Sequence, residues 1–499
     1  MVDYLKLQNG SDIRGVAIDG VDGQSVNLTD DVVVSIGKAF ALWLKNRLGR
    51  NENIKIYVGR DSRLSGKTLE SKIIEGLIYM GIDVYSCGLS STPAMFMSTV
   101  TEGHMADGAV MITASHLPFN RNGFKFFTRS GGREKAVIKE ILLLAQKNDF
   151  IKCSGGKCSN VDFMSVYADG LVKKIREKTG EEKPLHGFKI VVDAGNGAGG
   201  FFVKDVLVPL GADTRGSQFL EPDGSFPNHI PNPEDKVAMS YITKAVIENN
   251  ADLGIIFDTD VDRAAAVSSD GKEINRNRLI ALIGAILLRE NKGAVIVTDS
   301  VTSTGLSQFI KEQGGVHHRF KRGYRNVINE AIRLNNEGKN APLAMETSGH
   351  GALKENYFLD DGAYLCVVLL AELANARKKG QKLDSLISTL KEPCEKGEYR
   401  MNILCENFAE YGNQVIKELE EYANTVPYWK IADDNYEGIR VYADKNHGDG
   451  WFLLRMSLHD PLMPLNIESD SVGGECLIKC DVYSFLKKFD KLDTEILAK

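Results

Sequence analysis

Three times along the chain, a short run of β-branched residues ends in an acidic residue and small residues, and a helical pattern follows. The three segments are IKIYVGRDSRLSG (54–66), KIVVDAGNGAGG (189–200) and AVIVTDSVTSTG (294–305). Strands that alternate with helices are typical of α/β layers. The chain has 499 residues, which is too many for one hydrophobic core. The recurrence therefore predicts three related α/β domains.

Downstream of each segment lies a second apolar run that ends in chemically reactive side chains. These runs are GAVMITASH (108–116), LGIIFDTDVDR (253–263) and APLAMETSGHG (341–351), at similar intervals from the first strand of each repeat. Open α/β sheets bind ligands beyond the carboxyl ends of their strands. We therefore expect the three loops to share one cleft.

The remainder of the chain, from about residue 393, departs from this pattern. It carries an amphipathic helix signal over residues 408–422, followed by strand signals at 439–442 and 451–456. This mixture predicts a fourth, smaller α+β domain. The predicted domains cover residues 1–155, 156–274, 275–392 and 393–499, with linkers at 147–156 and near Pro393.

Composition excludes several classes of protein. The chain has 61 Lys and Arg against 67 Asp and Glu, and this mild acidity argues against nucleic acid or an anionic membrane as the main partner. The longest apolar run, residues 279–288, is too short to span a bilayer, and the first residues lack the plan of a signal peptide. The eight cysteines are scattered, without the spacing of a zinc site. We expect a cytoplasmic protein with reduced, buried thiols.

The loop DTDVDR carries three alternating carboxylates, Asp258, Asp260 and Asp262. In an extended segment all three would point to one side, where they repel one another unless a cation neutralises them. Hard oxygen ligands suit Mg²⁺. An EF-hand is excluded, because the glycine and glutamate it needs at its sixth and twelfth positions are Arg263 and Ser269 here. A solvated acidic turn is the alternative, although such turns rarely follow a buried strand. Arg263 could fork onto a phosphate oxygen.

The loop TASHL presents Ser115 and His116, with Lys125 on the next run. It differs from the GxSxG elbow of α/β-hydrolases. A serine near a divalent cation suits phosphoryl transfer, with the hydroxyl as carrier and cations stabilising the passing charge. His116 and Lys125 would transfer protons or contact phosphate. Taken alone, the Ser-His pair is also compatible with an ordinary turn.

The third loop, METSGHG, combines Glu346 with Thr347, Ser348 and His350. A carboxylate beside hydroxyls suits recognition of a polyol, although a helix N-cap accounts equally well for Thr347 or Ser348. Upstream, the basic segment HHRFKRGYR (317–325) is either a patch that faces phosphate or a solvated face.

Together these motifs resemble those of the α-D-phosphohexomutase superfamily, the phosphoglucomutase and phosphomannomutase enzymes. In order along the chain, SDIRG (11–15), TASHLP, DTDVDR and METSGH are similar to the family's arginine motif, phosphoserine loop, metal loop and sugar loop. The resemblance extends over essentially the whole chain. It implies four domains around a central cleft, the first three being related α/β units with mixed sheets.

The resemblance also implies a role for each matching residue. Ser115 would be the phosphoserine, and Mg²⁺ would be bound by the serine's phosphate together with Asp258, Asp260 and Asp262. The residues that would line the transfer site are Arg14, His116, Lys125 and Arg263. Those that would contact the sugar hydroxyls or lie near them are Glu346, Ser348, His350 and Lys321.

The implied reaction is a phosphohexomutase cycle on small phosphosugars. Phospho-Ser115 would give its phosphate to a hexose 6-phosphate, and the resulting hexose 1,6-bisphosphate would return its other phosphate to Ser115. The bisphosphate is thus an intermediate or activator, and the net reaction moves phosphate between O6 and O1. Neither nucleic acid nor a membrane is an expected partner. The preferred sugar, which is glucose, mannose or an amino sugar, and the oligomeric state stay open.

The fourth motif departs from the family pattern. The family's phosphate loop reads roughly RxSNTxP or RPSGTEP, whereas this chain has RMSLHDP (455–461). Arg455 and Ser457 match, but Leu458, His459 and Asp460 replace polar donors. A weaker hold on the distal phosphate would favour an alternative, a hexose-1,6-bisphosphate synthase that uses the same phosphoserine and releases the bisphosphate. A third reading, a phosphosugar-binding protein without catalysis, leaves Ser115 and the acidic trio without a purpose.

Overall fold

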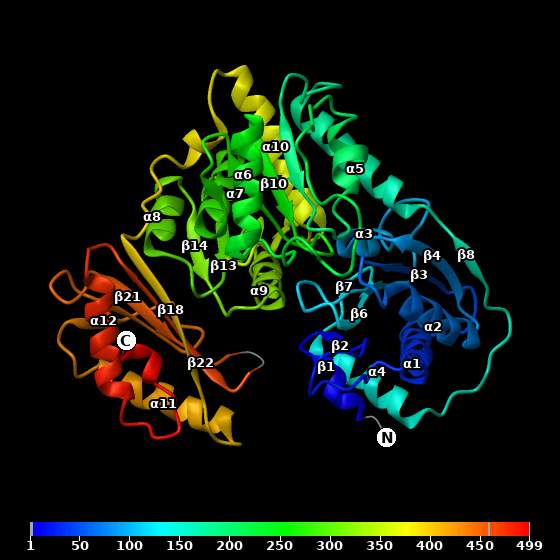
Figure 1. Cartoon of the computed structure of the whole chain (residues 1–499), viewed down its shortest axis with the longest axis horizontal. Coiled ribbons are helices and arrows are strands. Elements are labelled where there is room, and N and C mark those ends of the chain that lie inside the picture. The colour runs from blue at the N-terminus through cyan, green and yellow to red at the C-terminus, as the bar shows by residue number, and fades with distance from the viewer. Residues whose placement is uncertain (1–2, 458–459, 499) are drawn as a thin grey trace. The chain divides into compact units, whose positions relative to one another are not determined.

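The computed structural model describes residues 3–457 and 460–498. The chain divides into two compact units. Unit 1 comprises Met1–Leu279 and Ser348–Ser385, and unit 2 comprises Ile280–Thr347 and Leu386–Lys499. Figure 1 labels many of the helices and strands.

The first sheet of unit 1 has the strand order β1-β2-β6-β5-β3-β4-β8, with β7 paired to β6. Strands β5, β3, β4 and β8 run parallel, whereas β6 is antiparallel to β5 and to β2. The strands are β1 (Gln8–Asn9), β2 (Asp12–Val16), β3 (Lys55–Arg60), β4 (Asp83–Leu89), β5 (Gly108–Ile112), β6 (Arg121–Thr128), β7 (Gly131–Gly132) and β8 (Cys158–Asn160). The helices are η1 (Tyr4–Leu7), α1 (Asp30–Leu48), α2 (Gly66–Tyr79), α3 (Thr92–Met97), α4 (Lys135–Lys147) and α5 (Phe163–Thr179).

Helices α1, α2 and α4 cover one face of this sheet with a single apolar core, to which Phe40 of α1 and Phe126 of β6 belong. In Figure 1 α1 and α2 lie side by side, and two glycines permit their close approach. A Cβ atom on Gly37 would lie 2.6 Å from the Ile73 carbonyl oxygen, and one on Gly76 would lie 2.3 Å from the Val34 carbonyl oxygen. A larger residue at either position would push the helices apart.

The second sheet of unit 1 has the order β12-β11-β10-β9. Strands β9 (Ile190–Asp193) and β10 (Leu253–Phe257) are parallel, and β11 (Ala264–Ser268) and β12 (Glu273–Ile274) continue the sheet antiparallel. Helix α6 (Lys236–Asn249) packs against it through a buried apolar cluster. The other elements here are the π-helical turn η2 (Phe202–Leu207), β16 (Gly351–Leu353), η3 (Lys354–Asn356), β17 (Leu359–Asp360) and α10 (Gly362–Lys378).

The third repeat provides the parallel strands of unit 2. Strand β13 (Val295–Thr298) pairs in parallel with both β14 (Val316–Arg319) and β15 (Leu343–Met345). The associated helices are α7 (Arg276–Glu290), α8 (Thr304–Glu312) and α9 (Tyr324–Asn336).

The three strand pairs identified in the sequence are therefore neighbouring parallel strands: β3 with β5, β9 with β10, and β13 with β15. The two parallel strands of each pair end at the same edge of the sheet. The loop with the reactive side chains follows directly after the second strand of the pair. The prediction of three related α/β units with mixed sheets is confirmed. The four domain boundaries and the central cleft stay predictions.

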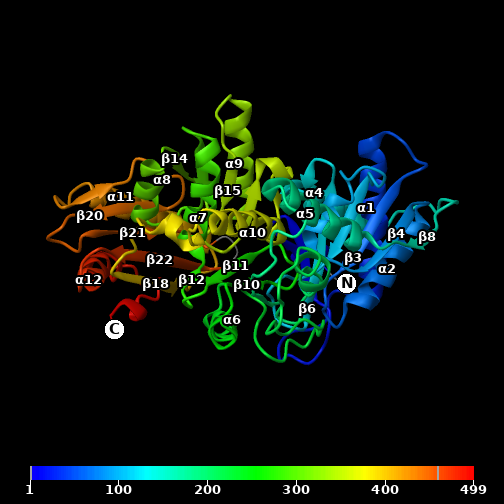
Figure 2. The same cartoon turned by 90° about the horizontal axis from the view of Figure 1, so that it is seen from above.

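The last part of unit 2 is an antiparallel sheet in the order β18-β22-β21-β20-β19. Its strands are β18 (Glu395–Asn402), β19 (Trp429–Ile431), β20 (Ile439–Ala443), β21 (Gly450–Leu454) and β22 (Leu462–Ser469). Helices α11 (Phe408–Ala423) and α12 (Gly474–Leu486) share one apolar core with this sheet, and Figure 2 shows α12 beside β22 and β18. The short helices η4 (Leu383–Ile387) and η5 (Glu495–Leu497) complete the described elements. The predicted α+β domain is confirmed.

One carboxyl group of this sheet makes stability depend on pH. Glu468 is partly buried and accepts a hydrogen bond from Trp451 Nε1 at 3.0 Å. Burial raises the pKa of Glu468 from 4.5 to about 7, although Arg440 acts in the opposite direction. The folded chain therefore keeps a proton that the unfolded chain has lost, and the free energy of unfolding falls as pH rises from about 4.5 to about 7.

We expect Glu468→Gln, which cannot ionise, to raise the thermal unfolding temperature at pH 8 by about 2–4 °C relative to the unsubstituted chain. The gain should shrink towards pH 5, where Glu468 is protonated in the folded chain. Thermal melts at both pH values measure it. An equal shift at pH 5 and pH 8 would mean that ionisation of Glu468 does not affect stability.

Two expectations from composition have definite outcomes. Among the described residues, every helix is too short or too polar to cross a membrane. All eight cysteines lie in the described part of the chain and are unpaired, but the expectation that they are buried is wrong for four of them. Those four, Cys158, Cys394, Cys476 and Cys480, are exposed, and only Cys366 is fully buried.

Candidate active site

The loop that follows β5 holds Ser115 in a conformation that is unusual for a residue with a side chain. Its φ angle is 49°, in the left-handed region, and only 8% of its surface is exposed. Its backbone N–H donates to Thr113 Oγ1 at 2.9 Å. Arg14 of β2 donates from Nη1 to the Thr113 carbonyl at 2.5 Å and from Nη2 to Asp12 at 2.8 Å. Arg14 thus anchors the end of the strand from which the serine extends.

The three aspartates that follow β10 converge, but not for the reason that the sequence suggested. Ligand oxygens of Asp258, Asp260 and Asp262 all lie within 4.8 Å of one another. The segment is a tight turn rather than extended, and Val261 within it has a φ of 66°. A β-branched residue in this region is strained, so surrounding contacts must hold the turn. One such contact is the backbone N–H of Thr92, which donates to the Asp260 carbonyl at 2.8 Å.

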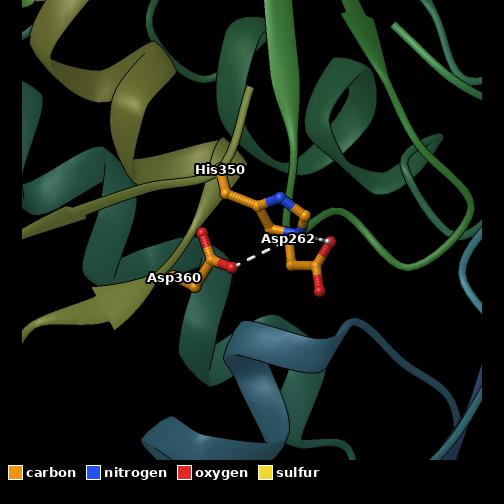
Figure 3. A group of neighbouring side chains, drawn as sticks. All are labelled: Asp262, His350 and Asp360. Atoms are coloured by element: carbon orange, nitrogen blue, oxygen red, sulfur yellow. Dashed lines mark ion pairs between the residues drawn. The ribbon is translucent and has the colours of Figure 1, made fainter. Parts of the chain in front are cut away.

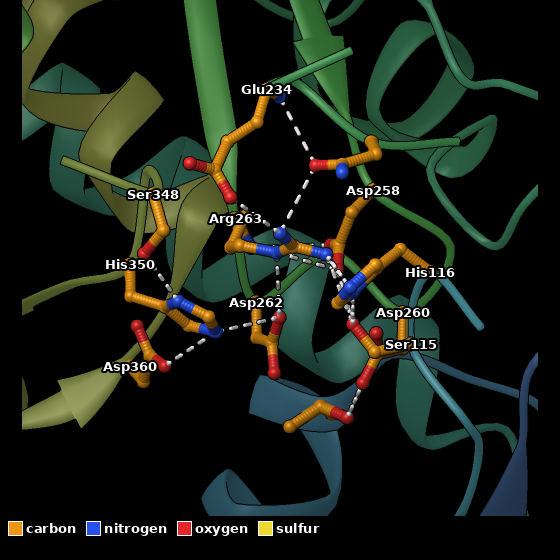
Figure 4. A network of polar contacts seen from close by, with 12 residues as sticks. Ser115, His116, Glu234, Asp258, Asp260, Asp262, Arg263, Ser348, His350 and Asp360 are labelled. Carbon is orange, nitrogen blue, oxygen red and sulfur yellow. Dashed lines mark hydrogen bonds and ion pairs between the residues drawn. The ribbon is translucent and has the colours of Figure 1, made fainter. Parts of the chain in front are cut away.

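The serine and the acidic trio meet directly (Figure 4). Ser115 Oγ donates to Asp258 Oδ2 at 3.0 Å, and Arg263 Nη2 donates to the same serine oxygen at 3.1 Å. Arg263 is itself held by Asp258, which accepts from its Nε at 3.2 Å, and by Asn232, which accepts from its Nη1 at 3.1 Å. One hydroxyl oxygen therefore contacts both a carboxylate and a fixed guanidinium.

His116 is a neutral donor in this arrangement. Its Nδ1 lies 2.8 Å from Arg263 Nη2. Because a guanidinium can only donate, Nδ1 accepts and the proton of the neutral ring sits on Nε2. Burial and the charges of Arg263 and Arg14 lower the pKa of His116 to about 3. The imidazole can therefore donate one N–H to a phosphoryl oxygen, but it adds no positive charge.

Lys125 of β6 provides a cation at the acidic trio. Its ammonium contacts Asp262 directly and lies 3.4 Å from Asp260 Oδ2. Burial, with the charges of Asp262 and Asp260, raises the pKa of Asp258 well above its usual value. Burial acts on Asp262 in the same direction, but Lys125 and Arg263 outweigh it and lower the pKa of Asp262. The trio thus concentrates more negative charge than a buried turn tolerates without a cation.

The donor set of the trio fits Mg²⁺. Asp260 Oδ1 and Asp262 Oδ1 are buried and accept no hydrogen bond from the described residues. Buried carboxylate oxygens normally have partners, and these two lie in a group whose ligand atoms are mutually close. Carboxylate oxygens are the hard ligands that Mg²⁺ prefers.

Two residues of the predicted sugar loop also reach this site. His350 forms an isolated antiparallel bridge with Arg263, and its Nδ1 lies 2.9 Å from Ser348 Oγ. Its Nε2 lies 3.7 Å from Asp262 Oδ1 and 3.5 Å from Asp360 Oδ2 (Figure 3). Burial, assisted by the charges of Arg263 and Lys125, holds the pKa of His350 well below its ordinary value. His350 is therefore a neutral ring between two carboxylates.

Sequence reasoning missed several neighbours of the site. Asp360 is at the end of β17, so its position after a short apolar run was the available signal. Asn232 contacts Arg263 from a loop whose polar and proline residues resemble an ordinary turn. Thr92, whose hydroxyl donates to Asp260 Oδ2 at 2.5 Å, looks from the sequence like one residue of a helix start.

The remaining predicted residues belong to unit 2. Glu346 accepts a hydrogen bond from the Gly323 N–H at 2.6 Å, and Lys321 is exposed in the same loop as Gly323. Thr347 donates from Oγ1 to Asp299 Oδ2 at 2.7 Å. In the described chain no helix begins directly after Thr347 or Ser348, so the alternative that one of them is a helix N-cap is wrong.

The basic segment 317–325 divides into two parts. The first part is structural, because His317 bonds to Thr298 and Ser307, and Arg319 binds Asp434 at 2.8 Å and two backbone carbonyls. Neither the phosphate-facing patch nor the solvated face describes it. The second part, from Lys321 onward, is partly or fully exposed up to Asn326.

Arg322 and Arg455 both lie near Glu437. The Arg322 N–H donates to Glu437 Oε2 at 2.9 Å, and Arg455 Nη1 lies 3.9 Å from Glu437 Oε1. Burial lowers the pKa of Arg455, and the positive charge of Arg322 adds to this effect. The Glu437 carboxylate acts in the opposite direction and is an anionic partner of Arg455 in unit 2.

The rest of the RMSLHDP loop is only partly described. The Ser457 N–H donates to the Leu462 carbonyl at 2.9 Å, and Ser457 Oγ accepts from the Asp460 N–H at 3.3 Å. Leu458 and His459, which depart from the family pattern, lie outside the described residues.

Three family models match the chain. They are described as phosphoglucomutase/phosphomannomutase, alpha/beta/alpha domains I, II and III, and they match residues 6–152, 165–271 and 275–393. Together they cover most of the chain.

Individual relatives agree with these matches. A phosphoglucomutase of Neisseria gonorrhoeae is 32% identical over 462 residues, which are 92% of this chain and 92% of that protein. A phosphomannomutase/phosphoglucomutase of Pseudomonas aeruginosa is 31% identical over 464 residues, which are 92% of this chain and 91% of that protein. The crystal structure of a phosphoglucomutase/phosphomannomutase family protein from Burkholderia thailandensis matches with a TM-score of 0.81 at 28% identity, covering 99% of this chain and 100% of that chain.

Proposed function

This chain belongs to the phosphoglucomutase/phosphomannomutase family of enzymes, and we propose that it interconverts hexose 6-phosphate and hexose 1-phosphate through a phosphoserine at Ser115. The substrate would be a glucose phosphate, a mannose phosphate or both. The observation that carries this proposal is the hydroxyl of Ser115, which contacts both Asp258 and Arg263. A serine so held beside buried carboxylates suits phosphoryl transfer, which needs positioning and charge neutralisation more than covalent assistance.

Each residue around Ser115 has a chemical task in this proposal. The serine directs its proton at Asp258 Oδ2, while Arg263 stabilises the negative charge that develops on the serine oxygen as the proton leaves. His116 offers its Nε2–H to a phosphoryl oxygen. Asp258, Asp260 and Asp262 would hold Mg²⁺, which when bound neutralises phosphoryl oxygens. Lys125 adds charge on the same side.

The proposed cycle begins with phospho-Ser115. The phosphoryl group passes to O1 of a hexose 6-phosphate: the O1–P bond forms, the P–O bond to the serine breaks, and the proton of O1 passes to the serine oxygen, which gives up a proton to O6 in the return step. The resulting hexose 1,6-bisphosphate then returns the phosphoryl group on O6 to Ser115, so the product is hexose 1-phosphate. Added hexose 1,6-bisphosphate would activate the enzyme, because it restores the phosphoserine. The deep burial of the trio and Arg263 protects the transferring group from water.

The remaining site residues are proposed to bind substrate. Contacts to sugar hydroxyls are assigned to Glu346 and Ser348, with His350 and Lys321 nearby. Arg455 and Ser457 would bind the phosphate that is not being transferred. We further propose that each predicted domain, 1–155, 156–274, 275–392 and 393–499, contributes one such loop. The partners would be small phosphosugars in the cytoplasm, rather than nucleic acid or membrane.

A direct assay tests the proposal against the bisphosphate synthase, which has no support from the mutase names of the relatives. The purified enzyme is given glucose 1-phosphate or mannose 1-phosphate with Mg²⁺ and a trace of the matching 1,6-bisphosphate. We expect many turnovers to the 6-phosphate for each molecule of bisphosphate added. Accumulation of bisphosphate in proportion to an added phosphoryl donor, without isomerisation, would contradict the mutase.

Removal of the arginine in the fourth motif should affect binding more than chemistry. We expect Arg455→Met to raise KM for the hexose phosphate about 10- to 100-fold, since a charge-assisted hydrogen bond contributes about 1.5–3 kcal/mol. Mg²⁺ affinity should stay unchanged, because the acidic trio is intact. Arg400→Met, which removes an exposed arginine on β18, is the control. An unchanged KM in Arg455→Met would mean that this loop does not bind substrate phosphate.

A further inference from the structure

The loop between β5 and β6 carries Ser115 without regular secondary structure of its own, and besides Arg14, which binds its first carbonyl, a second arginine binds its backbone. Arg63, in the loop after β3, donates from Nη2 to the carbonyl oxygens of Ser115 and Leu117, each at 2.5 Å. It donates from Nη1 to the carbonyl oxygens of Pro118 and Arg121 at 2.8 and 2.9 Å. One side chain thus fixes four carbonyl groups within seven consecutive residues.

Arg63 is itself held firmly. Its side chain and that of Asp61 are fully buried, with Nε 3.4 Å from Asp61 Oδ2. The Phe226 ring centroid lies 5.3 Å from the guanidinium carbon. A buried charge is costly unless it is paired and hydrogen-bonded, and here the partners are chiefly the carbonyls of one loop. A planar guanidinium with several donors can bind four carbonyls at once, which the compact ammonium of lysine cannot do in the same geometry.

This clamp acts on the strained residue of the loop. Ser115 has the left-handed φ of 49°, and Arg63 Nη2 binds its carbonyl oxygen. The backbone N–H of Ser115 is bound by Thr113, and its hydroxyl is bound by Asp258 and Arg263. Fixing the carbonyl restricts rotation of the peptide that follows Ser115, and so limits where Oγ can point.

We propose that Arg63 is a positioning residue for phosphoryl transfer, which clamps the loop so that Ser115 Oγ faces Asp258 and Arg263. The proposal rests on the proposed function for its catalytic consequence, but not for the clamp itself. Within the described residues, the side-chain hydrogen bonds and the ion pair of Arg63 go to those four carbonyls and to Asp61, and none goes to the serine hydroxyl or to the three aspartates. The positioning role is assigned to these backbone contacts, and Arg63→Lys keeps the positive charge, which also acts on Asp258 and Asp260.

A turn of the second repeat packs against the segment that carries Arg63. A Cβ atom on Gly224 would lie 2.4 Å from the backbone nitrogen of Leu64 and 2.5 Å from the carbonyl oxygen of Ser62. The turn that contains Gly224 and Phe226 therefore packs directly on the segment that carries Arg63. Only glycine permits this approach. Gly224→Ala is thus a second variant, which disturbs the clamp while leaving Arg63 and the active-site side chains in place.

The experiment compares Arg63→Met and Arg63→Lys with Arg60→Met, a control that removes a neighbouring, partly buried arginine paired with Glu70 at 3.0 Å. We expect kcat of Arg63→Met to fall about 100-fold, as an ångström-scale misplacement can cause, with KM within about threefold and Mg²⁺ affinity unchanged. Arg63→Lys should retain part of the rate. Hydrogen exchange of the peptide 113–121 should become faster in Arg63→Met and in Gly224→Ala, but not in Arg60→Met.

The two readouts separate the clamp from the proposed function. A wild-type enzyme without mutase activity would defeat the proposed function, whereas faster exchange of residues 113–121 in Arg63→Met would still establish the clamp. Unchanged exchange in a folded Arg63→Met would overturn the clamp, and a raised KM with an unchanged kcat would overturn the role of Arg63 in positioning Ser115. If Arg63→Met does not fold by circular dichroism, the same criteria apply to Arg63→Lys and Gly224→Ala.

Discussion

Replacement of Ser115 by alanine is expected to abolish mutase activity, with kcat lower by at least about four orders of magnitude. The side chain lost is the proposed carrier of the phosphoryl group, and it is the hydroxyl that contacts both Asp258 and Arg263. Steady-state turnover of glucose 1-phosphate, with saturating Mg²⁺ and a trace of the 1,6-bisphosphate, measures the loss.

Ser130→Ala, which removes a serine from the exposed turn after β6, is the matched control and should retain full activity. Ser115→Ala should also melt at nearly the temperature of the unsubstituted chain, because it loses only one side-chain oxygen. If Ser115→Ala kept more than about one per cent of the activity, another residue would have to be the phosphoryl carrier.

Substitution of Asp260 by asparagine is expected to lower kcat about 100- to 1,000-fold and to weaken Mg²⁺ binding. The change removes one of three clustered carboxylates, and one oxygen of Asp260 is buried without a hydrogen bond in the described part of the chain. The oxygen that accepts from Thr92 can be replaced by the amide oxygen, so the turn should still form. Magnesium titration of activity and calorimetric titration of the metal measure the two effects.

Asp270→Asn is the matched control for this prediction, since Asp270 is an exposed carboxylate on the hairpin that joins β11 and β12. Chelation with EDTA should abolish activity in the unsubstituted enzyme, and added Mg²⁺ should restore it. Near-normal activity of Asp260→Asn at low Mg²⁺ would refute the assignment of the trio as the metal site.

Much of the fold could be predicted because it follows from local patterns. Apolar runs that end in polar residues identified β5, β10 and β15, and the parallel pairing of each with an upstream strand follows from the repeat. The polar ends of two of these strands carry Ser115 and the aspartates, which a single compact unit brings together.

For the acidic trio, the convergence of the three carboxylates was predicted correctly, but the backbone conformation that produces it was not. Alternating positions suggested an extended segment, whereas the carboxylates converge across a tight turn in which Val261 is left-handed. The alternation of aspartates is compatible with an extended segment and with a turn. The β-branched Val261 would itself argue against the turn, because such residues rarely adopt a left-handed conformation. Contacts from distant residues such as Thr92 decide the conformation.

Other features were not accessible from the sequence at all. Arg63 binds backbone carbonyl groups, which every residue has, so the sequence does not indicate which residues it contacts. The basic segment looked uniform, but Arg319 is buried in a structural network whereas Lys321 is exposed. Burial separates the two, and burial depends on segments more than 100 positions away, such as the one that carries Asp434.

The most direct test of the central claim is to locate the phosphoryl group on the enzyme. The dephosphorylated chain is incubated with glucose 1,6-bisphosphate and Mg²⁺, and intact-mass measurement is followed by peptide mapping. The account predicts one added phosphoryl group on the peptide that contains Ser115, absent from Ser115→Ala and slowed in Asp260→Asn. A phosphoryl group on any other residue, or mutase turnover without a phosphorylated enzyme, would contradict it.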